Sequence, residues 1–265
     1  MYAFKFHKPS SIEDAARLFS GADDARYLSG GHTLLPSMKL RLAGPSDIVD
    51  LSGIDSLKGI KVEGDKVVIG AGTRHNDVAL SAEVRAAIPA LADLAGGIGD
   101  FQVRNRGTIG GSIANADPSA DYPAAIVGLG ATVHTNKREI AGDDFFTGMF
   151  ETALEDGEIV TAVSFPRPKR AAYMKFPNPA SRYAVVGVMV AETASGMRVA
   201  VTGAAPSVFR IAEMEQALAS NFSAEAIEGI TVPADDLNSD MHAAADYRAH
   251  LVGVMAKRAI AKAAG

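Results

Sequence analysis

The chain has 265 residues, of which 48% are apolar, so it is long enough for two or three units that each bury a core. Its formal net charge of −5 excludes a strongly basic nucleic-acid-binding surface, and its lack of cysteine excludes disulfides, thiolate nucleophiles and cysteine-ligated zinc or iron–sulfur centres. The sequence has neither a charged-then-apolar leader nor an apolar run of about 18 residues, so we expect a cytoplasmic protein with no membrane span and no nucleic-acid partner.

Residues 1–55 have the pattern of a compact αβ unit. An alternating apolar run within Met1–Pro9 predicts a strand, and Ser10–Ser11 with Asp14 downstream predicts the capped start of a helix that leads into Ala15–Phe19. The elements expected after this helix are the strand Arg26–Ser29, the helix Leu34–Leu42 and the strand Ile48–Leu51.

Residues 56–169 have a different pattern. Alternation around Gly64–Asp65 predicts a hairpin, and the alanine-rich stretch Ser81–Ile98 predicts helix that is broken near Pro89. The later elements expected in this unit are the helix Tyr122–Leu129 and the strands Ala131–Thr135 and Ile159–Phe165.

The run PRPKRAAY indicates a change of unit near residue 170. After it, Ala184–Thr193 and Met197–Gly203 predict paired strands around a turn at Ser195–Gly196. Apolar spacing predicts helices at Glu213–Ser220, Ser223–Gly229 and Asp246–Ala264. Residues 170–265 are therefore expected to form an α+β unit.

Two glycine pairs stand out as candidate ligand sites. In Gly107–Asp121 (GTIGGSIANADPSAD), the glycines are accompanied by short polar side chains, so we expect neither the middle of a helix nor a core strand. Glycine pairs let backbone N–H groups turn outward and let a ligand approach the main chain, which suits a phosphate or a diphosphate. An ordinary glycine-rich turn is the alternative.

The second pair, Gly30–Gly31, follows an expected strand and precedes an expected helix. A turn of this kind points free N–H groups at an anion. Neither stretch fits the Walker pattern or the dinucleotide fingerprint GxGxxG. Two such loops, far apart in the chain, could hold the two ends of one long cofactor.

Beyond these local patterns, SGGHTLLPSMKLRLA and QVRNRGTIGGSIANADPSADYPAA together resemble the FAD-binding medium subunit of the molybdenum hydroxylases. Within this family, the chain resembles the carbon monoxide dehydrogenase medium chains and the separate FAD chain of bacterial xanthine-dehydrogenase-type enzymes. The similarity continues to the C-terminal DMHAAADYRAHLVGVMAKRAI, so it covers almost the whole chain. It implies an α+β, FAD-binding fold of the vanillyl-alcohol-oxidase (PCMH) type, with two α+β subdomains, 1–55 and 56–169, and a small C-terminal CO-dehydrogenase-flavoprotein-like α+β domain, 170–265.

The resemblance also implies a function. FAD, held non-covalently, would take electrons from 2Fe–2S clusters in a small partner subunit and pass them to quinone, NAD or oxygen. The molybdopterin cofactor would lie in a large partner subunit, and the complex would be a dimer of heterotrimers. This chain would hold no metal and no catalytic residue of its own. A stand-alone FAD-dependent oxidoreductase of the same fold, or a scaffold that has lost FAD, are the alternatives.

Family positions imply the cofactor-binding residues. Ile98 and Gly99 would lie near the flavin ring, Val160 beside the adenine, and Lys175 would reach the cofactor with a positive charge. Asp121 would accept a hydrogen bond from a ribose hydroxyl or the flavin. The full set is Leu28, Ser29, Gly30, Gly31, His32, Thr33, Leu34, Leu35, Ile98, Gly99, Val103, Gly107, Thr108, Gly110, Gly111, Ser112, Ala114, Asn115, Ala120, Asp121, Val160 and Lys175.

Several other side chains keep two interpretations. Tyr183 would shield a flavin face or pack as an ordinary strand tyrosine. Arg104 and Arg106 would brace the second loop or contact a partner chain. Asp117 is expected to be a turn former, and His32, although in the first loop, could simply donate to a neighbouring carbonyl.

Overall fold

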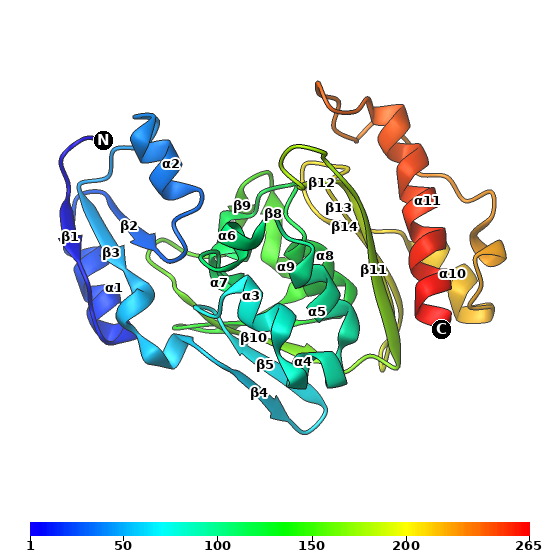
Figure 1. Ribbon diagram of the computed structural model, residues 1–265, viewed down its shortest axis with the longest axis horizontal. Coiled ribbons are helices and arrows are strands. Elements are labelled where there is room, and N and C mark those ends of the chain that lie inside the picture. The colour runs from blue at the N-terminus through cyan, green and yellow to red at the C-terminus, as the bar shows by residue number, and fades with distance from the viewer.

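The computed structural model describes all residues 1–265 and arranges them around three main sheets (Figure 1). The first sheet lies at one end of the molecule, the second lies in the middle, and the third separates the middle from the C-terminal helices. A two-stranded ribbon, β8 (Phe146–Gly148) with β9 (Glu151–Thr152), completes the strands. None of the helices combines the length and the apolar character that crossing a membrane requires.

The first sheet is parallel, in the order β1–β3–β2. The helix α1 begins where the sequence predicts, because Ser11 Oγ accepts the N–H of Asp14 at 3.1 Å and caps it. Its buried Ala15 packs in one small core with Val49 of the central strand. The elements of this unit are β1 (Lys5–His7), α1 (Ile12–Ser20), β2 (Ala25–Leu28), α2 (Leu34–Lys39), β3 (Asp47–Asp50) and the 3₁₀ turns η1 (Leu51–Gly53) and η2 (Asp55–Leu57).

The second sheet is antiparallel, in the order β4–β5–β10–β6–β7. The predicted hairpin forms with Gly64 at φ +62°, and the predicted break puts Pro89 at the start of a new helix, where its missing N–H costs nothing. The elements are β4 (Ile60–Glu63), β5 (Lys66–Gly70), α3 (His75–Leu80), α4 (Ala82–Ala87), α5 (Pro89–Gly96), α6 (Phe101–Arg104), α7 (Ile109–Asn115), α8 (Tyr122–Gly128), β6 (Thr132–Thr135), β7 (Glu139–Ala141), α9 (Gly142–Phe145) and β10 (Val160–Pro166).

The third sheet is an antiparallel meander whose two faces are both covered. Met189 of its second strand packs into the core of the middle unit, whereas Val188 and Val190 pack under the C-terminal helices. This explains the continuous apolar run AVVGVMVA, because a strand buried on both faces needs no polar alternation. The elements are β11 (Arg170–Pro177), β12 (Ala184–Thr193), β13 (Gly196–Thr202), β14 (Phe209–Arg210), α10 (Ala212–Ser220), η3 (Glu225–Ile227) and α11 (Ala245–Ala264).

The second glycine stretch corrects the sequence expectation, because it forms the short helix α7 rather than a loop. Ile109 and Ile113, four positions apart, are both buried on one side of it. Gly110 lets this helix approach its neighbour, since a Cβ there would lie 2.5 Å from the Cβ of Ala71. Two buried isoleucines therefore outweigh the poor helix propensity of the two glycines.

Two smaller differences concern the C-terminal unit. The strand β11 was not foreseen, because its outward positions carry polar groups such as Lys175 that contact the middle unit. The helix expected over Ser223–Gly229 is wrong: only the single 3₁₀ turn η3 forms, with Ile227 as its one buried residue.

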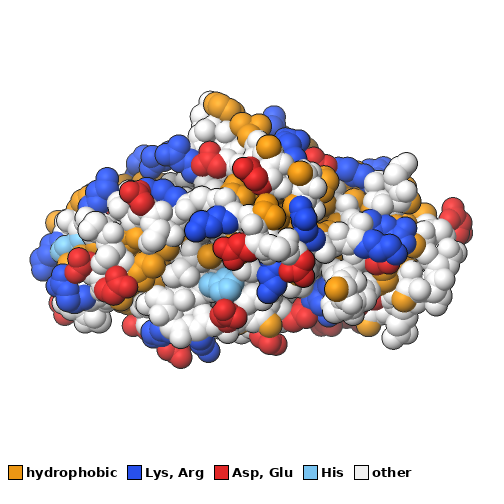
Figure 2. All heavy atoms as spheres, turned by 90° about the horizontal axis from the view of Figure 1, so that it is seen from below, with side chains coloured by type: hydrophobic (Ala, Val, Ile, Leu, Met, Phe, Trp, Pro, Cys, Tyr) orange, Lys and Arg blue, Asp and Glu red, His pale blue; other side chains and the backbone are white.

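Each of the stretches 1–55, 56–169 and 170–265 holds one main sheet, and we propose them as the three units of the chain. Leu57 and Ile159, from the middle stretch, complete the core of the first unit. The face seen in Figure 2 carries Lys and Arg interspersed with Asp and Glu.

Candidate functional site

A cavity of about 450 Å³ lies where the three units meet. The loop after β2 lines it from the first unit. The helix α7, the loop after α5 and the segment that enters β10 line it from the middle unit. Residues 181–183 close it from the C-terminal unit. A space of this size, lined from several elements, is typical of a small-molecule or cofactor site.

The first glycine loop carries a run of unused backbone donors. The N–H groups of residues 29–33 donate to no backbone carbonyl. Gly31 has φ +76°, so the chain turns there in a conformation that favours glycine, and Leu35 packs behind the turn. Because unpaired N–H groups need an acceptor, such a run of donors is suited to an anion.

The two glycine stretches touch each other directly. A Cβ at Gly30 would lie 2.5 Å from the carbonyl oxygen of Arg106 and 2.7 Å from the Cα of Gly107, so no larger residue fits there. Beside this contact, the hydroxyls of Ser29 and Thr108 lie 2.9 Å apart and form a hydrogen bond. The first and middle units are therefore joined at the edge of the cavity.

The second stretch offers fewer free donors than its sequence indicates. The N–H of Gly110 donates to the Ala71 carbonyl at 2.9 Å, and that of Ser112 donates to the Thr108 carbonyl at 3.0 Å. The N–H of Gly111 donates to Thr108 Oγ1 at 3.2 Å, which caps α7. Its glycines therefore provide close approach to the main chain, while the first loop provides the N–H groups.

An apolar part of the cavity lies beside the turn after α5. Ile98, Gly99 and Val103 line it, and Gly99 has φ +47°. Arg104 braces this turn, because its Nη1 donates to the Ile98 and Gly99 carbonyls at 3.0 and 3.1 Å. Tyr183 also lines the cavity and is 49% exposed, so its ring lies at the opening.

Asp121 lies at the wall within a buried polar network. Tyr173 donates to its Oδ1 at 2.6 Å, and the Nζ of Lys175 lies 2.9 Å from the same oxygen. Lys175 also donates to the carbonyls of Gly97 and Arg182, at 2.8 and 2.9 Å. Burial raises the pKa of the Asp121 carboxyl, while Lys175 and Tyr173 act in the opposite direction.

The donors of Lys175 are thus taken by three protein groups. Lys175 is not among the residues that line the cavity, and neither is Leu35. The other residues named from the sequence all line it. Their contact with a cofactor stays a prediction, and a direct contact of Lys175 would need one of these three bonds to be given up.

His75 is a lining residue that sequence reasoning missed. It is 5% exposed, its Nδ1 has no hydrogen-bond partner, and its ring lies against Gly107. Burial lowers its pKa to about 4, and the nearby His32 and Arg104 act in the same direction. The ring is therefore neutral at pH 7. His32 was the only histidine named from the sequence, because His75 lies outside both glycine stretches. No cluster of metal-ligating side chains forms in the structure.

Another part of the cavity wall is formed by the segment that leads into β10. Glu158, Ile159 and Val160 line it together with Tyr27 of β2. A register shift in β10 between Val160 and Ala162 frees this end of the strand from regular pairing. Of these residues, only Val160 was named from the sequence. The others are brought in by tertiary contact.

Two family models and several relatives match almost the whole length of the chain. Residues 2–168 match the family model of the FAD binding domain in molybdopterin dehydrogenase, and residues 171–263 match that of the CO dehydrogenase flavoprotein C-terminal domain. The chain is 37% identical to the carbon monoxide dehydrogenase medium chain of Hydrogenophaga pseudoflava, over 97% of this chain and 96% of that one. It is 35% identical to the nicotine 6-hydroxylase medium subunit of Paenarthrobacter nicotinovorans, over 98% of this chain and 97% of that one.

A solved structure gives the same result. Carbon monoxide dehydrogenase from Hydrogenophaga pseudoflava, in a form that lacks the Mo-pyranopterin moiety, contains a chain that superposes with a TM-score of 0.88 at 37% identity. The superposition covers 98% of this chain and 96% of that one.

Proposed function

Because the chain belongs to the family of FAD-binding medium subunits of the molybdenum hydroxylases, we propose that it holds FAD in the cavity between its glycine stretches and passes electrons from a partner subunit to an external acceptor. The α+β, FAD-binding fold of the vanillyl-alcohol-oxidase type with a C-terminal domain is confirmed. The chain is an oxidoreductase subunit of the carbon monoxide and xanthine dehydrogenase type.

The observation that carries the FAD site is the run of unpaired N–H groups at residues 29–33 beside the Gly30–Gly107 contact. A diphosphate has the negative charge that such donors need, and the glycines leave its oxygens room to approach the main chain. The lining of the cavity also includes Ile98 and Val160, which come from different segments of the middle unit. This arrangement suits a long cofactor whose diphosphate lies at its middle.

The residues of the chain would have distinct tasks toward FAD. The loop after β2 would hold the diphosphate, and Ile98 and Val103 would pack on the flavin ring. Tyr183, at the opening, would cover one face of the ring and keep bulk water from it. FAD, when bound, supplies the chemistry of accepting and releasing electrons. The protein supplies its position and its electrostatic surroundings.

The electrons would come from partner subunits. Without cysteine the chain has no ligands for an iron–sulfur cluster of the usual kind, and its acidic and histidine side chains form no metal-binding group. The relatives are named as medium chains or subunits. We therefore propose a small partner with 2Fe–2S clusters and a large partner with the molybdopterin cofactor, arranged as a dimer of heterotrimers.

The FAD site is tested by titrating the cofactor-free full-length chain with FAD and following the flavin absorbance and fluorescence. We expect saturation at one FAD per chain and strong competition by ADP, because the diphosphate is held by the first loop. A chain that binds no flavin would refute the site and would favour a scaffold that has lost FAD.

A further inference from the structure

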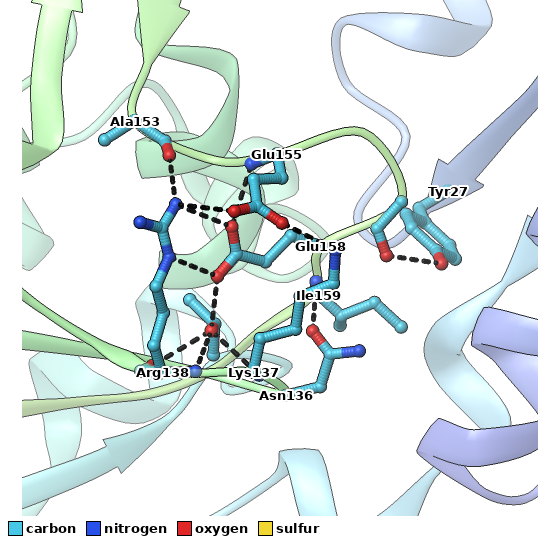
Figure 3. Close-up of polar contacts among 10 residues, drawn as sticks. Tyr27, Asn136, Lys137, Arg138, Ala153, Glu155, Glu158 and Ile159 are labelled. Atoms are coloured by element: carbon cyan, nitrogen blue, oxygen red, sulfur yellow. Dashed lines mark hydrogen bonds and ion pairs between the residues drawn. The ribbon is translucent and has the colours of Figure 1, made fainter.

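The loop 153–159, between β9 and β10, is held by the turn that joins β6 to β7 (Figure 3). Arg138 Nη2 donates to the Ala153 carbonyl at 2.6 Å and to Glu158 Oε2 at 3.1 Å, and its Nε donates to Glu158 Oε1 at 3.1 Å. Asn136 Oδ1 accepts the N–H of Ile159 at 2.8 Å. One turn of chain therefore holds both ends of the loop.

Glu158 is the centre of this network. Its side chain is fully buried, and it also accepts the Thr135 hydroxyl at 2.6 Å and the N–H of Glu155 at 2.8 Å. Although burial acts to raise the pKa of Glu158, the hydrogen bonds from Arg138, Glu155 and Thr135 lower it to about 2. Each carboxylate oxygen already accepts two hydrogen bonds, so Glu158 lines the cavity without a lone pair left for a ligand.

The same loop reaches across to the first unit. Tyr27 Oη donates to the carbonyl of Gly157 at 3.1 Å, as Figure 3 shows. Gly157 has φ +69°, and a Cβ there would lie 3.0 Å from the ring of Phe19. The Phe19 ring in turn stacks on the Tyr27 ring, with 4.6 Å between the two centroids. Ile159 belongs to the core of the first unit. The loop is thus a bridge between the two units that face each other across the cavity.

We propose that Arg138 is a positioning residue for the cavity and acts through Glu158 and the loop 153–159. The first and middle units are joined beside the glycines by the Ser29–Thr108 bond and, at a second point, by this loop. Leu57 also packs into the core of the first unit. These joints together fix the distance between the units, and loss of the joint at the loop would allow them to hinge on that side. Arg138 does not line the cavity itself, and it sets the place of the wall that Leu154, Glu158 and Ile159 form.

The wall held by Arg138 belongs to the adenosine end of the cavity. A flavin that exchanges electrons with a partner needs access to the surface, and the opening lies beside the half-exposed Tyr183. The wall held by Arg138 includes Ile159, whose neighbour Val160 is the residue that we propose beside the adenine, and the bond from Tyr27 to Gly157 joins this wall to the first unit. This inference rests on the proposed FAD site, and it adds that the two halves of the cofactor depend on different parts of the chain.

The test compares the binding of FAD, ADP and FMN to the cofactor-free full-length chain by calorimetry. For Arg138→Met we expect FAD and ADP to bind at least about tenfold more weakly, equivalent to about 1.4 kcal/mol, with FMN binding unchanged. Lys137→Met is the matched control, because the neighbouring Lys137 is bonded only to the exposed Glu155 and should leave all three affinities unchanged. Equal losses for ADP and FMN, or no loss for ADP, would overturn the proposal.

A second set of variants shows whether Arg138 acts through Glu158. The single variants Arg138→Met and Glu158→Gln each remove the same joint. The double variant Arg138→Met/Glu158→Gln should therefore bind ADP no more weakly than whichever single variant has the lower ADP affinity. Additive losses would contradict this coupling. Arg138→Lys keeps the positive charge and should bind ADP more tightly than Arg138→Met does. If Arg138→Met does not fold, Arg138→Lys takes its place in the comparison with the wild type. A wild-type chain that binds no FAD refutes the cofactor site itself, whereas FAD binding that Arg138→Met leaves unchanged refutes only this inference.

Discussion

At the scale of single residues, Gly111 lies at the point where a side chain would enter the cavity without disturbing the fold. A Cβ there would lie 3.0 Å from Thr108 Oγ1 and 3.8 Å from the Ser29 Cβ, with no backbone atom as close. We expect Gly111→Val to weaken FAD binding about tenfold or more, because the branched side chain occupies space that the diphosphate needs. The measurement is an FAD titration together with a thermal melt.

The control for this variant is Gly253→Val. Gly253 lies within α11, and a Cβ there would meet no atom within 4 Å. The control should bind FAD as the wild type does, and both variants should keep the fold. A full complement of FAD in Gly111→Val would count against the site.

His75 gives a prediction on pH. Its pKa is about 4 in the folded chain, against an ordinary value of 6.5, so the unfolded chain takes up the proton first as the pH falls. The stability contributed by the neutral ring is complete above pH 6.5 and is lost between pH 6.5 and about 4, by about 3 kcal/mol at the lower limit. Urea unfolding at a series of pH values should show this loss, and His75→Phe should flatten it. An equally steep slope in the variant would assign the effect to other groups.

At the scale of elements, Lys175 joins three segments of the cavity wall. From β11 it reaches Asp121 at the start of α8, Gly97 after α5 and Arg182 in the turn before β12. Its side chain is 10% exposed and that of Asp121 is 4% exposed, so the pair is shielded from water. The sequence assigned Lys175 to the cofactor, whereas the structure shows it bonded to the wall.

Lys175→Met should therefore destabilise the fold by about 3–5 kcal/mol, because it leaves a buried carboxylate without its cation. Chemical denaturation measures this loss. The double variant Lys175→Met/Asp121→Asn should recover much of it, since the uncompensated charge is then removed. If the single variant unfolds like the wild type and only the reduction potential of bound FAD falls, Lys175 acts on the flavin and not on the wall.

At the scale of the whole molecule, the chain has a cavity that we propose as the FAD site, and it has no metal-binding group and no cysteine. In the proposed function, the flavin receives its electrons from the partner subunits and not directly from an organic substrate. We expect the isolated chain to carry FAD that dithionite reduces, and to oxidise no purine, aldehyde or carbon monoxide. Turnover should appear only when the large and small partner subunits are added. Substrate oxidation by the isolated chain, with trace metal excluded by elemental analysis, would contradict the subunit assignment.

Exposed apolar side chains offer a place for such partners. Tyr2, Phe4 and Phe6 at the N-terminal strand are each more than one third exposed, and so are Leu40 and Leu42. Arg41 lies over the Tyr2 ring, so these two segments lie side by side. We propose this surface of the first unit as part of the contact with a partner subunit.

The sequence by itself determined the features that depend on neighbouring residues. The Ser11 cap, the hairpin at Gly64–Asp65 and the helix start at Pro89 each follow from local backbone chemistry, and the structure confirms them. The two glycine pairs could be picked out in the same way, because only glycine tolerates such close backbone contact. The family resemblance, carried by long motifs, then placed the fold.

Only the tertiary structure decided which distant groups pair. The sequence names Lys175 and Asp121 only as separate cofactor contacts, and it singles out neither Arg138 nor Glu158. The structure shows that each pair forms an ion pair that supports the cavity wall. The same holds for α7, where buried Ile109 and Ile113 impose a helix on a stretch with poor helix propensity. Desolvation and packing depend on neighbours that are distant in the chain, and no local pattern records those neighbours.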